Sequence, residues 1–314
     1  MPLKLLAAMC ITLLLLFGFL FGLLAAIGYY FELSGYLIVA LAIFLVFVEW
    51  LVSPALIRWT TNMRPLERGE LPWLKDTIEE LCKKNKVHTP KIFIAYSGRP
   101  NSFVFGRTPG SAELVVTKGL LNSLTKDEVR AVVAHEVGHI KHKDMVVMTV
   151  VGTIPVIAYF IARFLMFTPK RDEKRSVGAV LIGIAAFFIY AVTNLLVLGL
   201  SRLREYYSDR FGGENTKPRD LASGLAKITY GLGIAKENDN ESVRSFFIVD
   251  PLSAAGEISK FSSEYSDLEL SKDELKRAME WERKNPFARI GEIFSTHPLT
   301  YKRILALKEL EKEL

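Results

Sequence analysis

The segment TKDEVRAVVAHEVGH, residues 125–139, decides most of what the sequence indicates about the fold. It opens with a capping-box pattern, in which Thr125 accepts a hydrogen bond from the backbone of Glu128 and the Glu128 side chain returns one. An α-helix is therefore expected from here onward. On this helix His135 and His139 lie one turn apart on the same face, so both imidazoles can reach a single metal ion.

The residues around the two histidines indicate hydrolytic chemistry. Glu136 flanks the pair and can act as a general base toward an attacking water. Zinc suits the site because it accepts two histidines and a carboxylate and leaves a fourth position open. A three-histidine zinc site would need Gly at 142 and His at 145, whereas the chain has His142 and Met145. That class is excluded, and His142 is expected to be a solvent or lipid-interface residue.

A third ligand must come from another segment. Glu205 follows the last apolar run in a helical stretch, and Asp209 shares its face. Glu205 can therefore bind the metal while Asp209 accepts a hydrogen bond from a ligating histidine. By spacing alone, Glu214 and Glu292 are almost equally suitable. Asp144 could orient a metal-bound imidazole, or it could be a charge at a helix end before an apolar run.

Hydrophobic residues make up 50% of the 314-residue chain, and they are concentrated in four runs: 5–30, 33–57, 145–168 and 177–200. The first run has no charge and exceeds the roughly 20 residues that span a membrane, so it is too long for a signal peptide. Residues 1–58 are expected to form a transmembrane hairpin. Residues 145–200 are expected to form a second apolar hairpin, either transmembrane or membrane-embedded, because Pro155, Arg163 and a basic loop interrupt it.

The remaining segments, 59–144 and 201–314, are expected to form a zinc protease domain. Lys and Arg are frequent between the two hairpins and absent from the turn of the first, which places this domain in the cytoplasm by the positive-inside rule. Strands are predicted at 91–97, 102–106 and 113–117, and an exposed helix at 272–284. The net charge of +6 comes without a nucleic-acid-binding pattern, and only two cysteines are present. Nucleic acid as a partner and a cysteine metal site are therefore excluded.

Several segments resemble those of one protein family, the HtpX-like membrane zinc metalloproteases, which are relatives of the CAAX-prenyl endopeptidases. The resemblance covers nearly the whole chain. Besides the apolar N-terminal hairpin, the matching segments are 101–106, 135–139 continuing to Asp144, 205–209, 247–251, and 295–298 with Arg303. Tyr207, Ser208 and Asp250 depart from the residues common in the family, and none of these departures removes a ligand.

The resemblance implies a mainly α integral-membrane protein with a gluzincin-type α+β zinc protease domain, a small β-sheet and two apolar helical hairpins. It implies one Zn²⁺ per subunit, with Glu205 as the third ligand. It places His297 and Arg303 at the active site, where they support the helix of Glu205 or the reaction's oxyanion. It also places Asn101 on an edge strand along the cleft, so that Asn101, Ser102 and Phe103 are expected to bind substrate.

The expected activity is cleavage of membrane or misfolded proteins on the cytoplasmic side of the cell membrane, with the lipid bilayer as a further partner. A related alternative is an enzyme that cuts one defined substrate, such as a lipidated tail. A different alternative is a non-catalytic scaffold that keeps zinc for structure. Structural zinc sites use four protein ligands, so two histidines, one carboxylate and an intact Glu136 favour catalysis.

Overall fold

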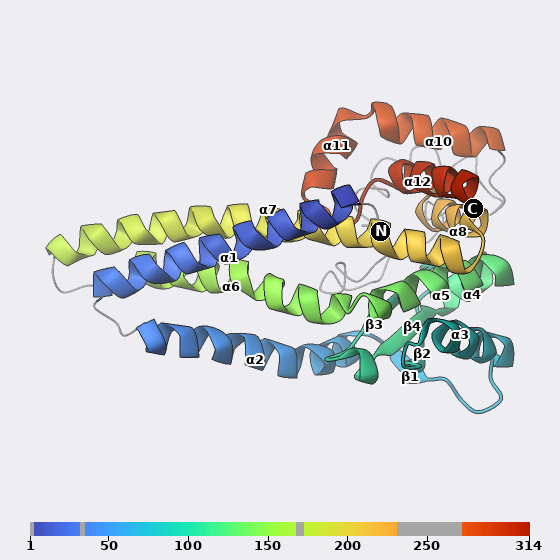
Figure 1. The fold of residues 1–314 in the computed structure, drawn as a ribbon, viewed down its shortest axis with the longest axis horizontal. Coiled ribbons are helices and arrows are strands. Elements are labelled where there is room, and N and C mark those ends of the chain that lie inside the picture. The colour runs from blue at the N-terminus through green and yellow to red at the C-terminus, as the bar shows by residue number, and fades with distance from the viewer. Residues whose placement is uncertain (1–2, 32–34, 168–172, 231–271) are drawn as a thin grey trace. The chain divides into compact units, whose positions relative to one another are not determined.

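The computed structural model describes residues 3–31, 35–167, 173–230 and 272–314, so the segment 247–251 lies outside the described residues (Figure 1). The elements are α1 (Leu3–Phe31), α2 (Gly35–Thr60), β1 (Met63–Pro65), α3 (Pro72–Asn85), β2 (Lys91–Ala95), β3 (Ser102–Phe105), the 3-10 turn η1 (Pro109–Ser111), β4 (Glu113–Thr117), α4 (Lys118–Ser123), α5 (Lys126–Lys141), α6 (Asp144–Phe167), α7 (Glu173–Asn215), α8 (Pro218–Tyr230), α10 (Lys272–Lys284), α11 (Pro286–Ile293) and α12 (Thr300–Glu313). The chain divides into an apolar unit, Met1–Ser53 with Val146–Leu203, and a second unit, Pro54–Met145 with Arg204–Leu314.

The apolar unit is built from helices. Among the residues that the structure describes, three stretches are long and apolar enough to cross a membrane, namely Ala7–Gly28, Asp144–Met166 and Gly178–Asn215. They pack together through a cluster that includes Leu16 of α1, Ile154 of α6 and Leu200 of α7. Large apolar side chains also cover the outside of these helices, which suits hydrocarbon better than water. Most side chains in the first half of α2 lie outside the described residues, so its membrane span stays a prediction.

A four-stranded sheet forms one layer of the second unit. Its strand order is β1-β2-β4-β3, with β2 and β4 parallel and the other two pairs antiparallel. The strands predicted at 91–97, 102–106 and 113–117 are confirmed as β2, β3 and β4. The short β1 was not predicted, because its three residues, Met63–Pro65, carry no alternating pattern. β3 is an edge strand of this sheet.

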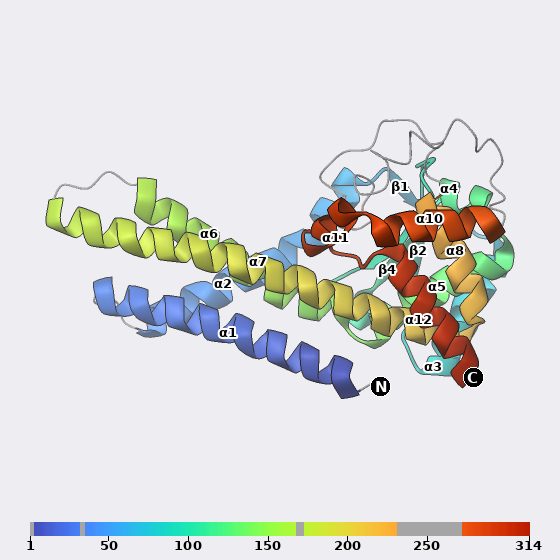
Figure 2. The ribbon, with the colours of Figure 1, turned by 90° about the horizontal axis from the view of Figure 1, so that it is seen from above.

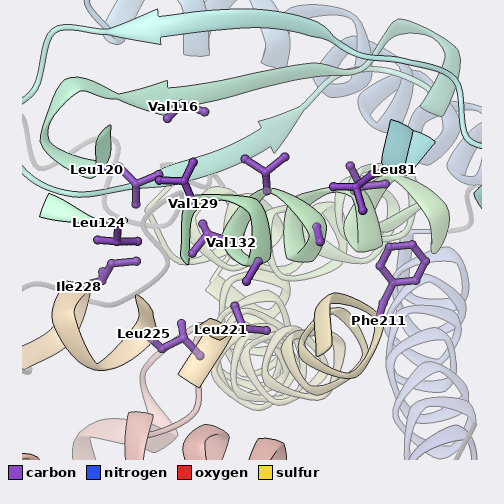
Figure 3. Packing of buried hydrophobic residues seen from close by; sticks show 14 of the residues in the cluster. Leu81, Val116, Leu120, Leu124, Val129, Val132, Phe211, Leu221, Leu225 and Ile228 are labelled. Carbon is purple, nitrogen blue, oxygen red and sulfur yellow. The ribbon is translucent and has the colours of Figure 1, made fainter. Parts of the chain in front are cut away.

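Helix α5 occupies the centre of the second unit, and the predicted capping box at Thr125 and Glu128 is confirmed at its start. The helix contacts β3 and α3 on one side and α8 on the other. Figure 3 shows Val129 and Val132 of α5 among these neighbours, with Leu225 of α8 opposite. Because α5 is buried on most of its faces, its polar side chains are fixed by their surroundings.

The C-terminal helices cover α8. α12 lies along α8, and α10 contacts both helices (Figure 2). The sequence predicted 272–284 as an exposed helix, and this was wrong for one face. Glu282 is buried there and accepts hydrogen bonds from the Tyr230 hydroxyl at 2.7 Å and the Tyr301 backbone N–H at 2.8 Å. These bonds fix the start of α12.

Candidate metal centre

Helices α5 and α7 bring two histidines and a glutamate together. Nε2 of His135 and Nε2 of His139 are 3.1 Å apart. The Glu205 carboxylate lies against both, with Oε1 3.4 Å from His139 Nε2 and Oε2 3.7 Å from His135 Nε2. One ligand atom from each residue falls within 4.8 Å of the others, so the three could hold one metal ion.

Two glycines let the helices approach closely enough for this geometry. A Cβ added to Gly138 of α5 would lie 3.2 Å from the Cα of Ser208 on α7. A Cβ added to Gly212 of α7 would lie 3.2 Å from the backbone N of His135. Backbone therefore meets backbone at the level of the ligands, and larger residues would separate the helices.

Each histidine has a carboxylate at its other ring nitrogen. Nδ1 of His135 is 3.0 Å from Asp209 Oδ1, and Nδ1 of His139 is 2.7 Å from Asp144 Oδ2. A proton on each Nδ1 leaves both Nε2 atoms with free lone pairs. Two such lone pairs 3.1 Å apart, facing a buried carboxylate, repel one another unless a cation lies between them. The residues therefore fit a bound metal.

Arg303 links the carboxylates behind the site. Its side chain is 1% exposed and donates to both oxygens of Asp209, from Nε at 2.8 Å and from a terminal nitrogen at 2.6 Å. Its other terminal nitrogen is 3.1 Å from Glu205 Oε2. Burial disfavours the charge of Arg303, but Asp209 and Glu205 outweigh burial and raise the pKa of the guanidinium. The group therefore stays charged and fixes both carboxylates.

Glu136 and His297 complete the centre. Glu136 is 2% exposed, and burial raises the pKa of its carboxyl above the usual value. Nε2 of His297 is 3.8 Å from Glu205 Oε1. Burial lowers the pKa of His297 to about 4, so its ring is neutral near pH 7. Thr296 Oγ1 lies 2.9 Å from Nδ1 of this ring.

The structure separates Glu205 from the alternatives that spacing left open. Glu214 pairs with Arg210 at 2.7 Å, and Glu292 pairs with Lys302 at 2.5 Å. Neither belongs to the possible ligand group found among the described residues. His142 is half-buried, and its ring packs edge-on against Tyr207 and Phe211. His142 is also absent from the possible ligand group, and its position at solvent or the lipid interface stays a prediction.

Sequence reasoning missed three contributors to the centre. Arg204 pairs with Asp144 and also donates to the backbone oxygen of His142 at 2.9 Å. Ser208 Oγ is 3.0 Å from His139 Nδ1. Gly138 makes the close helix contact. The sequence contained a signal for Ser208, because this residue follows Glu205 by three positions and so lies on the same face of the helix.

The predicted substrate-binding residues are held by the sheet. Asn101, Ser102 and Phe103 are all buried. The N–H of Asn101 donates to Thr117 Oγ1 at 2.8 Å, and Ser102 Oγ donates to the backbone oxygen of Val115 at 3.0 Å. All three side chains are therefore shielded from solvent, and the Asn101 backbone and the Ser102 hydroxyl hold β3 against β4. β3 itself contacts α5, which carries the two histidines.

A metal-binding centre between two helices, with a buried glutamate beside the ligands, places the chain among the metallopeptidases. Residues 69–311 match the sequence model of a protein family described as "Peptidase family M48". A "Protease HtpX homolog" from Methanothermobacter thermautotrophicus is 38% identical over 77% of this chain and 92% of its own length. Another "Protease HtpX homolog", from Aeropyrum pernix, is 34% identical over 87% of this chain and 86% of its own length. The chain therefore belongs to peptidase family M48, and it is a membrane metalloprotease.

A solved structure agrees at the level of the fold. The crystal structure of S. mikatae Ste24p aligns with a TM-score of 0.51, covering 98% of this chain and 67% of that one. The identity is 18%, so the likeness is one of fold alone. The expected fold class, a mainly helical membrane protein with a small sheet, is confirmed.

Proposed function

We propose that the chain is a zinc-dependent endopeptidase that cleaves membrane or misfolded proteins on the cytoplasmic side of the cell membrane, in protein quality control. The convergence of His135, His139 and Glu205 beside Glu136 carries this proposal. The basic residues of segment 58–143 support the cytoplasmic side.

The proposed ligands of one Zn²⁺ are His135, His139 and Glu205, a set that leaves a fourth position open, as catalytic zinc sites do. When bound, the ion would supply Lewis acidity to the scissile carbonyl and to the attacking water. Asp209 and Asp144 hold the imidazoles in the tautomer that presents Nε2. Arg303 in turn holds Asp209 and Glu205.

Glu136 is proposed as the general base. Burial raises the pKa of the Glu136 carboxyl toward pH 7. A carboxylate with a pKa near the working pH accepts a proton and later returns it most effectively. Glu136 would take a proton from the attacking water and return it to the leaving amine. If the Thr296 hydroxyl donates to Nδ1, the neutral His297 carries its proton on Nε2 and would donate it to the developing oxyanion.

The substrate backbone is proposed to add to the sheet beside β3. Thr117 N–H donates to the Asn101 carbonyl at 3.0 Å, so the main chain of Asn101 faces β4. Alternation along an antiparallel strand then turns the main chain of Ser102 and Val104 toward the open edge. These groups could bond an extended peptide.

Replacing Glu136 with Gln tests the proposal. The wild type and the variant would be solubilised in detergent and given an unfolded membrane protein, with and without a chelator. Glu136→Gln is expected to lose cleavage and keep one zinc per chain. A matched control is Glu214→Gln, at an exposed ion pair, which should stay active. Cleavage by Glu136→Gln would overturn the mechanism. Zinc binding without cleavage by the wild type would instead favour the structural-zinc scaffold.

A further inference from the structure

Helix α11 exposes an apolar face that the proposed peptidase chemistry does not use. Phe287 is 74% exposed, Ile290 is 56% exposed, and Phe294, directly after the helix, is 65% exposed. Spacings of three and seven residues place these side chains on one side of a helix. An exposed cluster of large apolar groups marks a surface that contacts a protein or a membrane.

The opposite face of α11 is fixed to the rest of the unit. Glu292 accepts a hydrogen bond from the Leu299 backbone N–H at 3.2 Å and pairs with Lys302 at 2.5 Å. The N-cap Asn285 accepts from the Phe287 backbone at 2.9 Å, and Pro286 occupies the first turn. These bonds hold α11 in place on its inner face, so its apolar side chains point outward.

Exposed basic residues lie near this face in the sequence. Arg283 and Lys284 end α10, and Arg289 lies within α11; all three are exposed. Arg289 also donates to the Arg283 carbonyl at 2.9 Å, which holds the two basic residues together. An apolar stripe beside Lys and Arg is typical of a helix lying in the interface of an anionic bilayer.

The position of α11 in its unit also suits a membrane. The loop that follows α11 carries His297, whose Nε2 is 3.8 Å from Glu205 Oε1. The part of α7 that belongs to this unit begins at Arg204, so Glu205 is its second residue here. The loop that follows α11 therefore lies close to the first residues of α7 that belong to this unit.

We propose that α11 is an interfacial helix, which inserts Phe287, Ile290 and Phe294 among the headgroups of an anionic bilayer while Lys284 and Arg289 contact the lipid phosphates. The proposal rests on the membrane location of the proposed function. It adds a second attachment of the peptidase unit to the lipid, on the segment that leads into the His297 loop. A substrate protein on the same face is the competing occupant.

A fluorescent label on α11 tests this without any substrate. A cysteine at Ile290 (Ile290→Cys) would be labelled with NBD in a chain that carries Cys10→Ala; Cys82 is 0% exposed and stays unlabelled. The holoprotein would be placed in nanodiscs of phosphatidylglycerol and phosphatidylcholine containing a shallow spin-labelled lipid. Lys308→Cys, at an exposed position on α12, is the matched control.

The label at 290 is expected to show blue-shifted emission and to be quenched by the spin-labelled lipid by about twofold or more, while the label at 308 is not quenched. The quenching should weaken when phosphatidylcholine replaces all the phosphatidylglycerol, and this lipid dependence should disappear in Lys284→Glu/Arg289→Glu. Water-like emission at 290 would overturn the proposal. Shielded emission without lipid quenching, or shielding only after an unfolded protein is added, would assign the face to protein and overturn it too. Because cleavage is not measured, a failure here is distinct from a failure of the proposed peptidase mechanism.

Discussion

Gly138 of α5 lies directly against Phe211 of α7, such that a methyl group added to Gly138 would sit 3.1 Å from the Phe211 ring. The same methyl would lie 3.2 Å from the Cα of Ser208, which cannot turn aside as a side chain can. Gly138 stands between His135 and His139, the two proposed metal ligands on α5, so any separation of the helices there moves Glu205 away from the imidazoles.

Gly138→Ala is expected to push α7 outward, to destabilise the fold by about 1–3 kcal/mol as overpacking does, and to weaken zinc binding several-fold. Titration with a competing chelator and thermal unfolding of the solubilised chain measure the two effects. Gly291→Ala is the control, because a Cβ at Gly291 of α11 would meet nothing within 4 Å. If Gly138→Ala bound zinc as tightly as the wild type, the close approach would not matter for the site.

Asp209 is expected to act on the metal through His135 and on stability through Arg303. Asp209→Asn should lower zinc affinity by about 10- to 100-fold, as the loss of a supporting carboxylate does. It should also destabilise the chain, since Arg303 would lose one partner for its buried charge. Chelator competition and thermal unfolding check both.

A second substitution separates these two effects. In Asp209→Asn/Arg303→Met the unpaired buried charge is gone, so part of the stability should return while zinc affinity stays low. Recovery of zinc affinity in the double variant would show that Asp209 acts on the site through Arg303 and not through the His135 imidazole.

The sequence predicted the parts of the site that lie within one helix. His135, Glu136 and His139 follow from the spacing within α5, and the capping box at Thr125 marks where α5 begins. The third proposed ligand, which comes from outside α5, could not be chosen by spacing. Glu205 and Glu292 differ in the residues that the fold places beside them. Those contacts depend on helix packing, which sequence periodicity does not encode.

The β3 edge offers a third prediction. Val104→Pro removes an N–H that faces the open edge, while the main-chain bonds of Phe103 to β4 remain. Stability should change little, and kcat/KM for an unfolded protein should fall by up to about tenfold, the worth of one hydrogen bond. Zinc content should not change. Unaltered kcat/KM would exclude substrate addition at this edge.

Phe103→Pro is the control for that experiment. Phe103 pairs with Val115 of β4, and by alternation its N–H faces that strand. A proline one residue away from the open-edge groups should therefore disrupt the ladder and lower the thermal midpoint. Equal thermal stability of the Phe103 and Val104 variants would contradict the assigned alternation.

Glu128 gives a prediction about pH that is independent of the metal. Burial raises the pKa of its carboxyl, but hydrogen bonds from Ser223 and the Thr125 N–H, together with Lys227, outweigh burial and lower the pKa below the usual value. A lowered pKa in the folded chain stabilises that chain at pH values above the usual carboxyl pKa of about 4.3. The stabilisation is lost as pH falls through the folded-state pKa.

Glu128→Gln is therefore expected to lower the free energy of unfolding by about 1–2 kcal/mol near pH 7, the size of a helix-cap effect, and the difference from wild type should shrink below about pH 4. Thermal unfolding across this range should be followed with chelator present, because zinc release also depends on pH. Asp127→Asn, in the same helical turn, is the control and should change stability by less than about 1 kcal/mol. A Glu128→Gln difference that stays constant down to pH 3 would show that the charge of Glu128 does not stabilise the start of α5. The start of α5 would then be held by the Thr125 cap and by apolar packing against its neighbours.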